Sequence, residues 1–287
     1  MKAAFITAAE WPNLWEDDQL AASHLRAQGH EIVPVVWDRT SAAALNAFDA
    51  VVIRNPWDWF KRPLEFKSFL ERLGDVGVPL FNKQSMLLEY FEKTYLRTLE
   101  ARGVPIVPTR WLTRDALDTL PALLREAGWA RVVIKPTVSA NSHDTHLFSP
   151  AEVRRVMASL RNAAGHDEYM VQPYLDEIEH DGEWSLIFFG SRFSHSVRKY
   201  PKLGDFRVQA GHGGRSEPAV PSAALIAQAT MVIERGVPDS LYARVDGVVR
   251  DGQLLLMELE VVEPELFFRA DPDASGRFSE ALVNALK

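Results

Sequence analysis

The fold is decided near the end of the chain by the stretch YARVDGVVRDGQLLLMELEVV, residues 242–262. Two apolar runs, Leu241–Val249 and Gln253–Val262, flank the turn-forming pair Asp251-Gly252. This pattern predicts a β-hairpin, because Asp-Gly supplies the backbone conformations that a tight turn between paired strands needs. Residues on the two strands are therefore expected to lie side by side.

Three acids of this hairpin, Asp246, Glu258 and Glu260, are expected to face one region, since side chains two apart on a strand share a face. Unpaired carboxylates so close together repel one another, and a divalent cation between them resolves the repulsion. All-oxygen ligands favour Mg²⁺ or Mn²⁺. The alternative is that the acids edge a solvated face of the sheet. Arg244, two residues before Asp246, favours a metal-bound polyphosphate instead.

Composition limits the classes of partner. The chain has 287 residues, 47% of them apolar, enough for one large core or a few smaller ones. A net charge of −7 argues against non-specific binding to nucleic acid or membranes, so small molecules are the expected partners. The absence of cysteine excludes disulfides and thiolate chemistry. No segment approaches about 18 apolar residues, and we expect a cytoplasmic protein. A homodimer is compatible with the sequence, which does not fix the oligomeric state.

The first part of the chain alternates strands and helices, which predicts a parallel sheet with a crevice at the carboxyl ends of its strands. The loop after the third strand begins at such an end. It contains Arg54, Asn55, Trp57 and Asp58, a candidate substrate wall; plain surface packing is the alternative. The expected elements are strands at Lys2–Ala9, Glu31–Val36, Ala50–Arg54 and Val78–Phe81 and helices at Asp17–Gln28 and Pro63–Leu73.

The remainder of the chain is expected to form further units. Ser149 is a candidate N-cap for a helix that ends at Ala163. From Asp181 onward the pattern becomes a larger sheet. The expected elements are helices at Ser85–Arg102, Arg114–Ala127 and Ser222–Arg235, strands at Arg131–Lys135, Tyr169–Gln172, Glu183–Phe189 and Arg192–Lys199, and polar loops at Pro136–His146 and Tyr200–Arg215.

Several motifs along the chain suit a nucleotide. No P-loop and no dinucleotide-binding glycine motif is present, so phosphates must be held in another way. Lys135 ends the apolar run Val132–Ile134, and Lys93 follows Glu92 on a helix; a solvated surface lysine is the alternative for each. These motifs resemble, in their order, those of the ATP-grasp ligases: Glu92-Lys93, Val132–Pro136, Met170–Leu175, Gly182-Glu183, Arg244–Asp246 and Glu258–Glu260.

The resemblance spans residues 83–268 and implies a fold of the α/β class. It implies an N-terminal pre-ATP-grasp α/β domain (1–82), a connecting helix (83–108), a small lid subdomain (109–175) and a C-terminal sheet domain with the metal site (176–287). It also implies metal ligation by Asp246, Glu258 and Glu260, with ATP and Mg²⁺ as cofactors. The implied nucleotide contacts are Lys93, Lys135, Ser139, Gln172, Leu175, Glu183 and Lys199.

Two departures from the family pattern stand in the site. The family usually has Asn at the second position of its metal pair, where this chain has Glu260, which adds negative charge. The phosphate loop of the family is often glycine-rich, whereas residues 139–142 contain no glycine. The long loop at 200–215 resembles the basic segment of ligases of the glutathione synthetase type. That resemblance implies that Arg207, together with Arg244, stabilises the transferred phosphoryl group; a solvated loop arginine is the alternative for Arg207.

Such a site implies an ATP- and Mg²⁺-dependent ligase that joins a carboxylate to an amine through an acyl phosphate. The segments Pro34–Asp38, Trp57-Asp58, Glu183–Leu186 and Gly204–Arg207 resemble the branch that includes the cyclo-ligase forming D-cycloserine from O-ureido-D-serine. An amino-acid-like substrate is therefore expected, with intramolecular ring closure or ligation of two substrates left open. A small-molecule kinase on the same scaffold and a non-catalytic nucleotide sensor are the alternatives.

Overall fold

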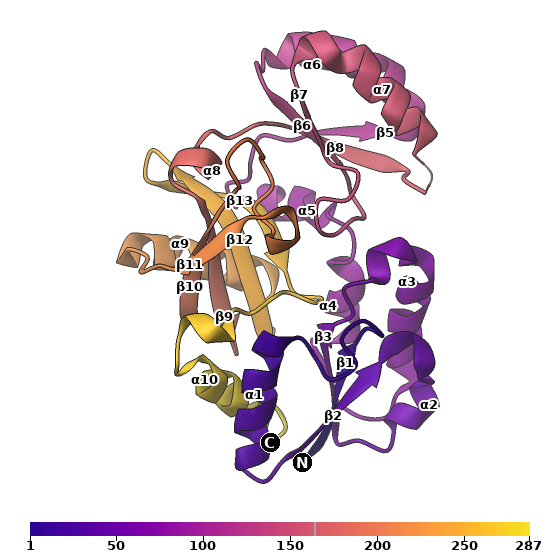
Figure 1. Cartoon of the computed structure of the whole chain (residues 1–287), viewed down its shortest axis with the longest axis vertical. Coiled ribbons are helices and arrows are strands. Elements are labelled where there is room, and N and C mark those ends of the chain that lie inside the picture. The colour runs from indigo at the N-terminus through magenta and orange to yellow at the C-terminus, as the bar shows by residue number, and fades with distance from the viewer. Residues whose placement is uncertain (164) are drawn as a thin grey trace.

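A computed structural model of the chain describes residues 1–163 and 165–287. Three sheets organise the molecule, each in a separate region of Figure 1. A four-stranded N-terminal sheet lies at the lower right, a five-stranded sheet at the left centre and a second four-stranded sheet at the top. The predicted α/β class is confirmed. None of the helices in the described part of the chain has the length and apolar content needed to cross a lipid bilayer.

The N-terminal sheet is parallel, with the strand order β2-β1-β3-β4, as the alternation of strands and helices predicted. Successive side chains of β1 enter different cores: Ala4 and Ile6 pack with α3, while Ala3 and Phe5 pack with α1 and with the C-terminal helix α10 (Ala274–Ala285). Both faces are therefore covered, as parallel sheets require. The elements of this region are β1 (Lys2–Thr7), α1 (Glu16–Ala27), β2 (Glu31–Val36), α2 (Ala42–Leu45), β3 (Ala50–Asn55), α3 (Pro63–Arg72) and β4 (Leu80–Phe81).

The predicted helix Ser85–Arg102 is wrong as a single element. Two short helices, α4 (Gln84–Glu89) and α5 (Tyr95–Ala101), are separated by a turn that contains Lys93. The amide N–H of Lys93 donates to the carbonyl of Thr137 at 2.9 Å, so this backbone pairs with a loop of the upper sheet instead of continuing a helix. The break brings Lys93 toward the space between the sheets.

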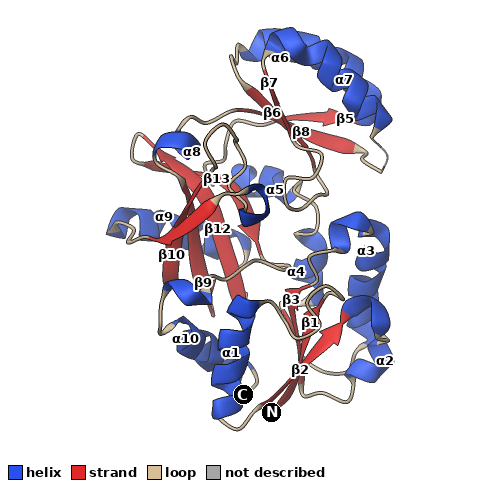
Figure 2. Cartoon of the chain, in the orientation of Figure 1, coloured by secondary structure: helices blue, strands red, loops and turns tan. Residues whose placement is uncertain are grey.

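The upper sheet is antiparallel, with the strand order β5-β8-β6-β7. Val132 and Ile134 face its two long helices, which cover its outer side in Figure 2, so Lys135 points to the other side. Ser149 and Glu152 form a capping box, which confirms Ser149 as a cap. The elements are β5 (Arg110–Thr113), α6 (Leu120–Ala127), β6 (Val132–Pro136), β7 (His146–Phe148), α7 (Val153–Asn162) and β8 (Glu168–Pro173).

The five-stranded sheet is antiparallel, with the order β11-β10-β9-β12-β13, and contains the predicted hairpin. Asp251 and Gly252 both have positive φ, at 52° and 77°, which is the conformation of a tight hairpin turn. Val245 and Leu259 pack in a core that includes α9, as expected for the apolar face. The elements are α8 (Glu177–His180), β9 (Glu183–Phe189), β10 (Arg192–Tyr200), β11 (Arg215–Pro218), α9 (Ala223–Gly236), β12 (Tyr242–Arg250), β13 (Gln253–Glu260) and α10 (Ala274–Ala285).

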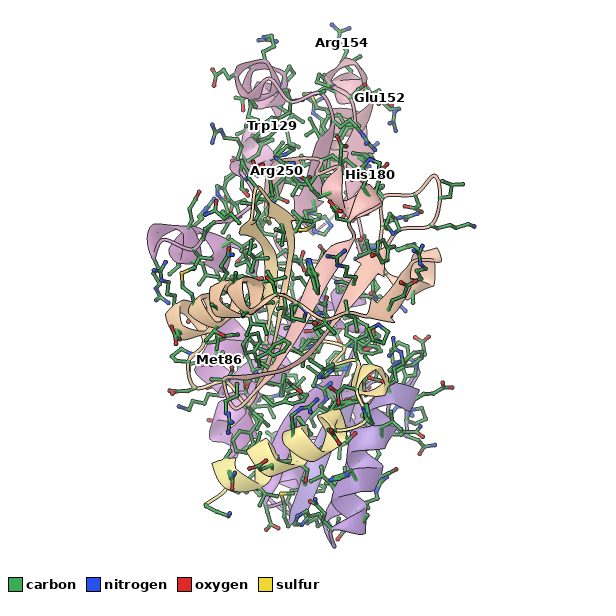
Figure 3. All side chains as sticks on the ribbon, turned by 90° about the vertical axis from the view of Figure 1, so that its left-hand side faces the viewer. Met86, Trp129, Glu152, Arg154, His180 and Arg250 are labelled. Atoms are coloured by element: carbon green, nitrogen blue, oxygen red, sulfur yellow. The ribbon has the colours of Figure 1, made fainter. Side chains whose placement is uncertain are left out.

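Helix α8 joins the upper sheet to the five-stranded sheet. Figure 3 shows His180 of α8 and Arg250, at the end of β12, near the junction of these two parts and below Trp129 and Arg154 of the upper part. Arg250 pairs with Glu177 of α8 at 2.5 Å. This ion pair ties the connection between the sheets to the tip of the hairpin.

The N-terminal sheet is fixed to the hairpin by buried polar contacts. The side-chain amide of Asn82 donates to the carbonyls of Tyr242 and Val261 at 2.9 and 2.7 Å, and its oxygen accepts from the N–H of Leu241 at 2.7 Å. The hydroxyl of Tyr242 donates to the carbonyl of Ile53 at 2.7 Å. These bonds hold the carboxyl end of β3 beside the hairpin, so both can form one site.

Candidate active site

A cavity of about 980 Å³ lies where the three sheets meet. This volume is near the upper end of the range for small-molecule sites, about 300–1,000 Å³. Arg54, Asn55 and Asp58 do not line it. The predicted site residues that do line it are Trp57, Lys93, Lys135, Ser139, Gln172, Leu175, Glu183, Lys199, Arg207, Arg244, Asp246, Glu258 and Glu260.

The hairpin supplies one wall of the cavity. Asp246 pairs directly with Glu258 across the two strands, and Arg244 pairs with Glu260, so all four side chains share a face. Arg244 donates from Nε to both oxygens of Asp246 at 3.0 Å and from Nη2 to Glu260 at 2.6 Å. The alternative of a solvated sheet face does not hold, since Asp246 is only 2% exposed.

Lysines from two other strands complete the charge pattern. Lys135 of β6 reaches across the cavity and pairs with Glu258 at 2.7 Å. Lys199 of β10 lies 2.5 Å from Glu183 and 3.4 Å from Asp246. Each carboxylate was expected to need a metal ion as its counter-charge, but in this structure lysine and arginine side chains fill that role. The surface alternative for Lys135 is excluded, because its side chain is only 12% exposed.

The predicted substrate wall is only partly at the cavity. Arg54 is fully buried and pairs with Asp18 at 2.5 Å, and Asn55 donates to the other oxygen of Asp18 at 2.9 Å. Asp58 accepts from the indole N–H of Trp37 at 2.8 Å. These three side chains hold the loop in place instead of facing the cavity. Trp57 alone of this group reaches the lining.

Sequence reasoning missed Trp11, Trp15 and Glu263, which also line the cavity. Trp11 and Trp15 follow β1, at the same carboxyl edge of the parallel sheet as the loop after β3. The rule that ligands bind at this edge could have found them. Glu263 follows the hairpin and accepts the indole N–H of Trp59 at 2.5 Å, a contact between residues 204 positions apart that no local pattern indicates.

Comparison with known proteins decides the family. Over 262 residues the chain is 35% identical to the cycloserine biosynthesis protein DcsG of Streptomyces lavendulae, covering 84% of each chain. It belongs to the ATP-grasp ligases. Residues 3–82 match the family model described as the N-terminal domain of D-cycloserine synthetase DcsG.

Solved structures agree with this assignment. The crystal structure of D-cycloserine synthetase DcsG superposes with a TM-score of 0.89 at 26% identity over the whole of both chains. D-alanine–D-alanine ligase from Bacillus anthracis has the same fold, with a TM-score of 0.66 at 17% identity over 99% of this chain and 95% of that one. Glutathione synthetase of Vibrio cholerae is 24% identical over 254 residues, which cover 85% of this chain and 75% of that protein. The protein is therefore an ATP-dependent ligase that forms C–N bonds.

The carboxylates of this ATP-grasp ligase differ in their electrostatics. Burial raises the pKa of Glu260 to about 8, and Asp246 and Glu258 add to the rise despite the attraction of Arg244. Burial acts in the same direction on Glu258, but Lys135 and Lys93 outweigh it and hold the pKa of Glu258 at about 2. Glu260, at the position where the family usually has Asn, therefore holds a proton more tightly than a free carboxyl group does.

A divalent cation suits this wall chemically. Within residues 1–163 and 165–287, no three His, Asp or Glu side chains are arranged as a ready metal site, since Asp246, Glu258 and Glu260 each turn toward a cationic side chain. All donors are nevertheless carboxylate oxygens, which Mg²⁺ prefers. A cation would also offset the burial and the neighbouring carboxylates that raise the pKa of Glu260. The donor set fits the ion, and metal ligation by these three residues stays a prediction.

The predicted nucleotide residues occupy two parts of the cavity. Lys93 donates to the carbonyl of Ser139 at 2.5 Å, at the loop of the upper sheet. Gln172 donates to Thr109 at 2.9 Å, and Leu175 packs in an apolar cluster that includes Val107 and Met257. An apolar cleft beside backbone and amide groups suits a flat purine base. Glu183, another of the implied nucleotide contacts, is buried against Lys199.

The two loops above the hairpin meet each other. Ser142 donates to Gln209 at 3.0 Å, and the ring of His212 bonds to the carbonyl of Asn141 at 3.1 Å. Arg207 pairs with Asp205 at 2.7 Å and lines the cavity. The upper-sheet loop and the long loop of the larger sheet therefore cover the cavity from opposite sides.

Proposed function

We propose that this ATP-grasp ligase uses ATP and Mg²⁺, with Mn²⁺ able to substitute, to activate the carboxylate of an amino-acid-like substrate as an acyl phosphate. A nitrogen of the same molecule then displaces phosphate and closes a ring. The main support for this proposal is the contact of Lys135 with Glu258 at 2.7 Å, which brings a lysine of the upper sheet to the carboxylates of the five-stranded sheet. The relationship to DcsG supports O-ureido-D-serine as the substrate and D-cycloserine as the product.

The residues divide into three roles in this proposal. Asp246, Glu258 and Glu260 would hold the metal ion, which supplies charge neutralisation at the phosphates when it is bound. Gln172, Leu175 and Glu183 would bind the adenosine part. The phosphates would be held by the cationic side chains at Lys93, Lys135, Lys199 and Arg244 and by the loop at Ser139.

Phosphoryl transfer needs little covalent chemistry from the protein. A carboxylate oxygen of the substrate bonds to the γ-phosphorus as the bond from that phosphorus to ADP breaks. The ureido nitrogen bonded to oxygen next attacks the acyl carbon and loses its proton, and phosphate leaves with the former carboxylate oxygen. The ring then still carries the carbamoyl group on that nitrogen, and water must remove this group as carbon dioxide and ammonia to give D-cycloserine. Arg207 and Arg244 would stabilise the charge that develops on the transferred group and on the tetrahedral oxyanion.

The ion pairs of the structure prepare these residues for ligands. A carboxylate or ammonium group buried without a partner would carry a large desolvation cost. Lys135 and Glu258 avoid that cost by pairing with each other. When ligands bind, a polyphosphate can replace Glu258 as the partner of Lys135, and a metal ion can replace Lys135 as the partner of Glu258. Each charged group therefore keeps a partner throughout.

We also propose that the chain works as four units at 1–82, 83–108, 109–175 and 176–287. The three sheets fall into the first, third and fourth of these ranges, and every strand of a sheet lies within the same range. The range 109–175 would act as a lid over the nucleotide. Assembly as a homodimer in the cell cytoplasm remains a prediction of this proposal.

The test is isotope transfer. The protein is incubated with ATP, Mg²⁺ and O-ureido-D-serine that carries ¹⁸O in its carboxylate, and the phosphate is analysed by mass spectrometry. One ¹⁸O in the released phosphate, together with ADP and a cyclic amide, is the expected result. A phosphorylated product that retains the phosphate would indicate a kinase, and the absence of ADP release across amino acids and ureido-amino acids would indicate a nucleotide sensor.

A further inference from the structure

One acid of the cavity differs from the others. Nearly all acidic side chains in the lining lie within 4 Å of a basic side chain. Within residues 1–163 and 165–287, Glu263 has no such ion pair. The paired acids are Asp144, Glu183, Asp246, Glu258, Glu260 and Glu265.

Glu263 is held in place by two indoles. Its Oε1 accepts from Nε1 of Trp59 at 2.5 Å, and its backbone carbonyl accepts from Nε1 of Trp57 at 2.8 Å. Its own backbone N–H also donates to the carboxylate, and in the described part of the chain no side chain other than that of Trp59 donates a hydrogen bond to it. The residue thus presents a fixed, partly desolvated carboxylate to the cavity without a counter-charge. Burial raises the pKa of Glu263, which reflects that missing partner.

Aromatic rings line the same cavity and are linked to Glu263 through Trp57, which donates to its backbone carbonyl. Trp11, Trp15 and Trp57 contact one another, with ring centroids 5.2 to 6.0 Å apart, and all three are half-buried in the cavity lining. The face of an indole attracts a cation, and it attracts one more strongly where water is excluded. Indoles with an unpaired carboxylate are a combination suited to an ammonium group.

The basic groups of the cavity lie apart from Glu263. Arg244 and Lys93 are the basic groups whose fields act on Glu263, although neither lies within ion-pair distance. Anionic parts of a ligand are therefore attracted to Arg244 and to the lysines around the hairpin, and a cationic part to Glu263 and the tryptophans. An amino acid carries both kinds of group, one carbon apart.

We propose that Glu263, with the indoles of Trp11, Trp15 and Trp57, binds the α-ammonium group of the substrate and so directs its carboxylate toward Arg244 and the phosphates. This inference rests on the proposed function, because it takes the substrate to be an amino acid. It assigns the selection of amino acids over their deaminated counterparts to one carboxylate. Glu263 is a substrate-binding residue here, distinct from the three predicted metal ligands.

The test compares two ligands on matched proteins by calorimetry. O-ureido-D-serine and 3-(ureidooxy)propanoic acid, which lacks the α-ammonium group, are titrated into wild type and E263Q with Mg²⁺ and a non-hydrolysable ATP analogue. Wild type should bind the amino compound at least about tenfold more tightly than the deaminated one. In E263Q the affinity for the amino compound alone should fall, so most of the difference between the two affinities should be lost. Glutamine can still accept from Trp59, so the loop should keep its position.

Two further variants sharpen the result. Glu265→Gln removes a carboxylate from the same loop that is already paired with Arg269 at 2.7 Å, and it should leave the ratio of the two affinities within about twofold of wild type. Trp15→Leu removes one aromatic face and should reduce the ratio about two- to fivefold. If E263Q still prefers the amino compound as wild type does, or if wild type binds both compounds equally, the ammonium subsite is overturned.

The experiment distinguishes failure of the ammonium subsite from failure of the proposed ligase reaction. ADP release from the same wild-type protein reports on the activity alone. Discrimination that depends on Glu263 without ADP release would reject the cyclising reaction and keep the ammonium subsite. ADP release with equal affinity for both compounds would keep the reaction and reject the subsite.

Discussion

Two buried arginine–aspartate pairs in this molecule have different surroundings. Arg54 and Asp18 are both 0% exposed and are closed off beneath the loop after β3. Arg244 and Asp246 are also buried, at 9% and 3% side-chain exposure, but they line the cavity and share Arg244 with the 29% exposed Glu260. The comparison shows that a charged pair on a strand indicates a binding site only where the pair lines a cavity. Elsewhere the pair stabilises the fold.

The largest effect is expected at the closed pair. Arg54→Met leaves Asp18 buried without its cation and should lower the free energy of unfolding by about 3–5 kcal/mol. Urea denaturation measures this loss. The double variant Arg54→Met with Asp18→Leu removes both charges and should recover part of it. A single variant as stable as wild type would show that this pair does not anchor the loop.

The open pair should show the opposite behaviour. Glu258→Gln removes a charge from the hairpin wall without changing core volume, so kcat for ADP release should fall about 10²–10³-fold while the protein stays folded. Stability should fall by less than in Arg54→Met, because Lys135, which loses its partner, borders the open cavity. Glu234→Gln, on the exposed side of α9, is the matched control and should keep full turnover. Turnover near that of wild type in Glu258→Gln would remove Glu258 from the site.

The lysine opposite Glu258 should act on binding. Lys135→Ala removes a cation that lies 2.7 Å from Glu258, and we expect ATP affinity to fall about tenfold or more, because a charge-assisted contact to phosphate is lost. Calorimetry with an ATP analogue and Mg²⁺ measures the change. Lys83→Ala, where the side chain is 63% exposed, serves as control. Unchanged affinity in Lys135→Ala would count against its assignment.

The smallest effect concerns pH. Because the pKa of Glu260 is raised to about 8, the folded protein keeps a proton that the unfolded chain releases near pH 4.5, and stability should fall as pH rises from 4.5 to 8. Glu258, with its pKa lowered to about 2, contributes stability above pH 4.5 that is lost as pH falls toward 2. Partial exposure limits the Glu260 effect to about 1 kcal/mol.

Urea denaturation across this pH range checks the assignment. Glu260→Gln should show a smaller fall in stability between pH 5 and 8 than wild type, since it has no proton to release. An equal fall in the two proteins would place the titrating group elsewhere. The comparison is made without divalent metal, so that protonation alone changes the charge of the wall.

The sequence predicts the hairpin well because both signals are local. Asp251-Gly252 fixes the turn, and alternation fixes which side chains share a face, so the positions of Asp246 and Glu258 follow. The break at Lys93 could not be predicted, since it depends on a hydrogen bond to Thr137 in another sheet and on no glycine or proline. The same limit explains why the predicted helix is wrong there.

The site could be predicted only in part for the same physical reason. Arg54 and Arg244 both stand near acids in the folded chain, but only the structure shows that Arg54 donates to the carbonyl of Pro264 and to Asp18 in a closed interior. Glu263 was missed because its partner, Trp59, lies 204 positions away in the sequence. Local spacing shows which residues can share a face, and long-range packing decides which of them reach the cavity.

The most direct test of the account is a crystal structure with a non-hydrolysable ATP analogue and Mg²⁺. The account predicts magnesium held by carboxylate oxygens of Asp246, Glu258 and Glu260 beside the phosphates, with Lys135 moved from Glu258 to a phosphate oxygen. An analogue bound away from the hairpin, with Lys135 still paired to Glu258, would contradict the central claim.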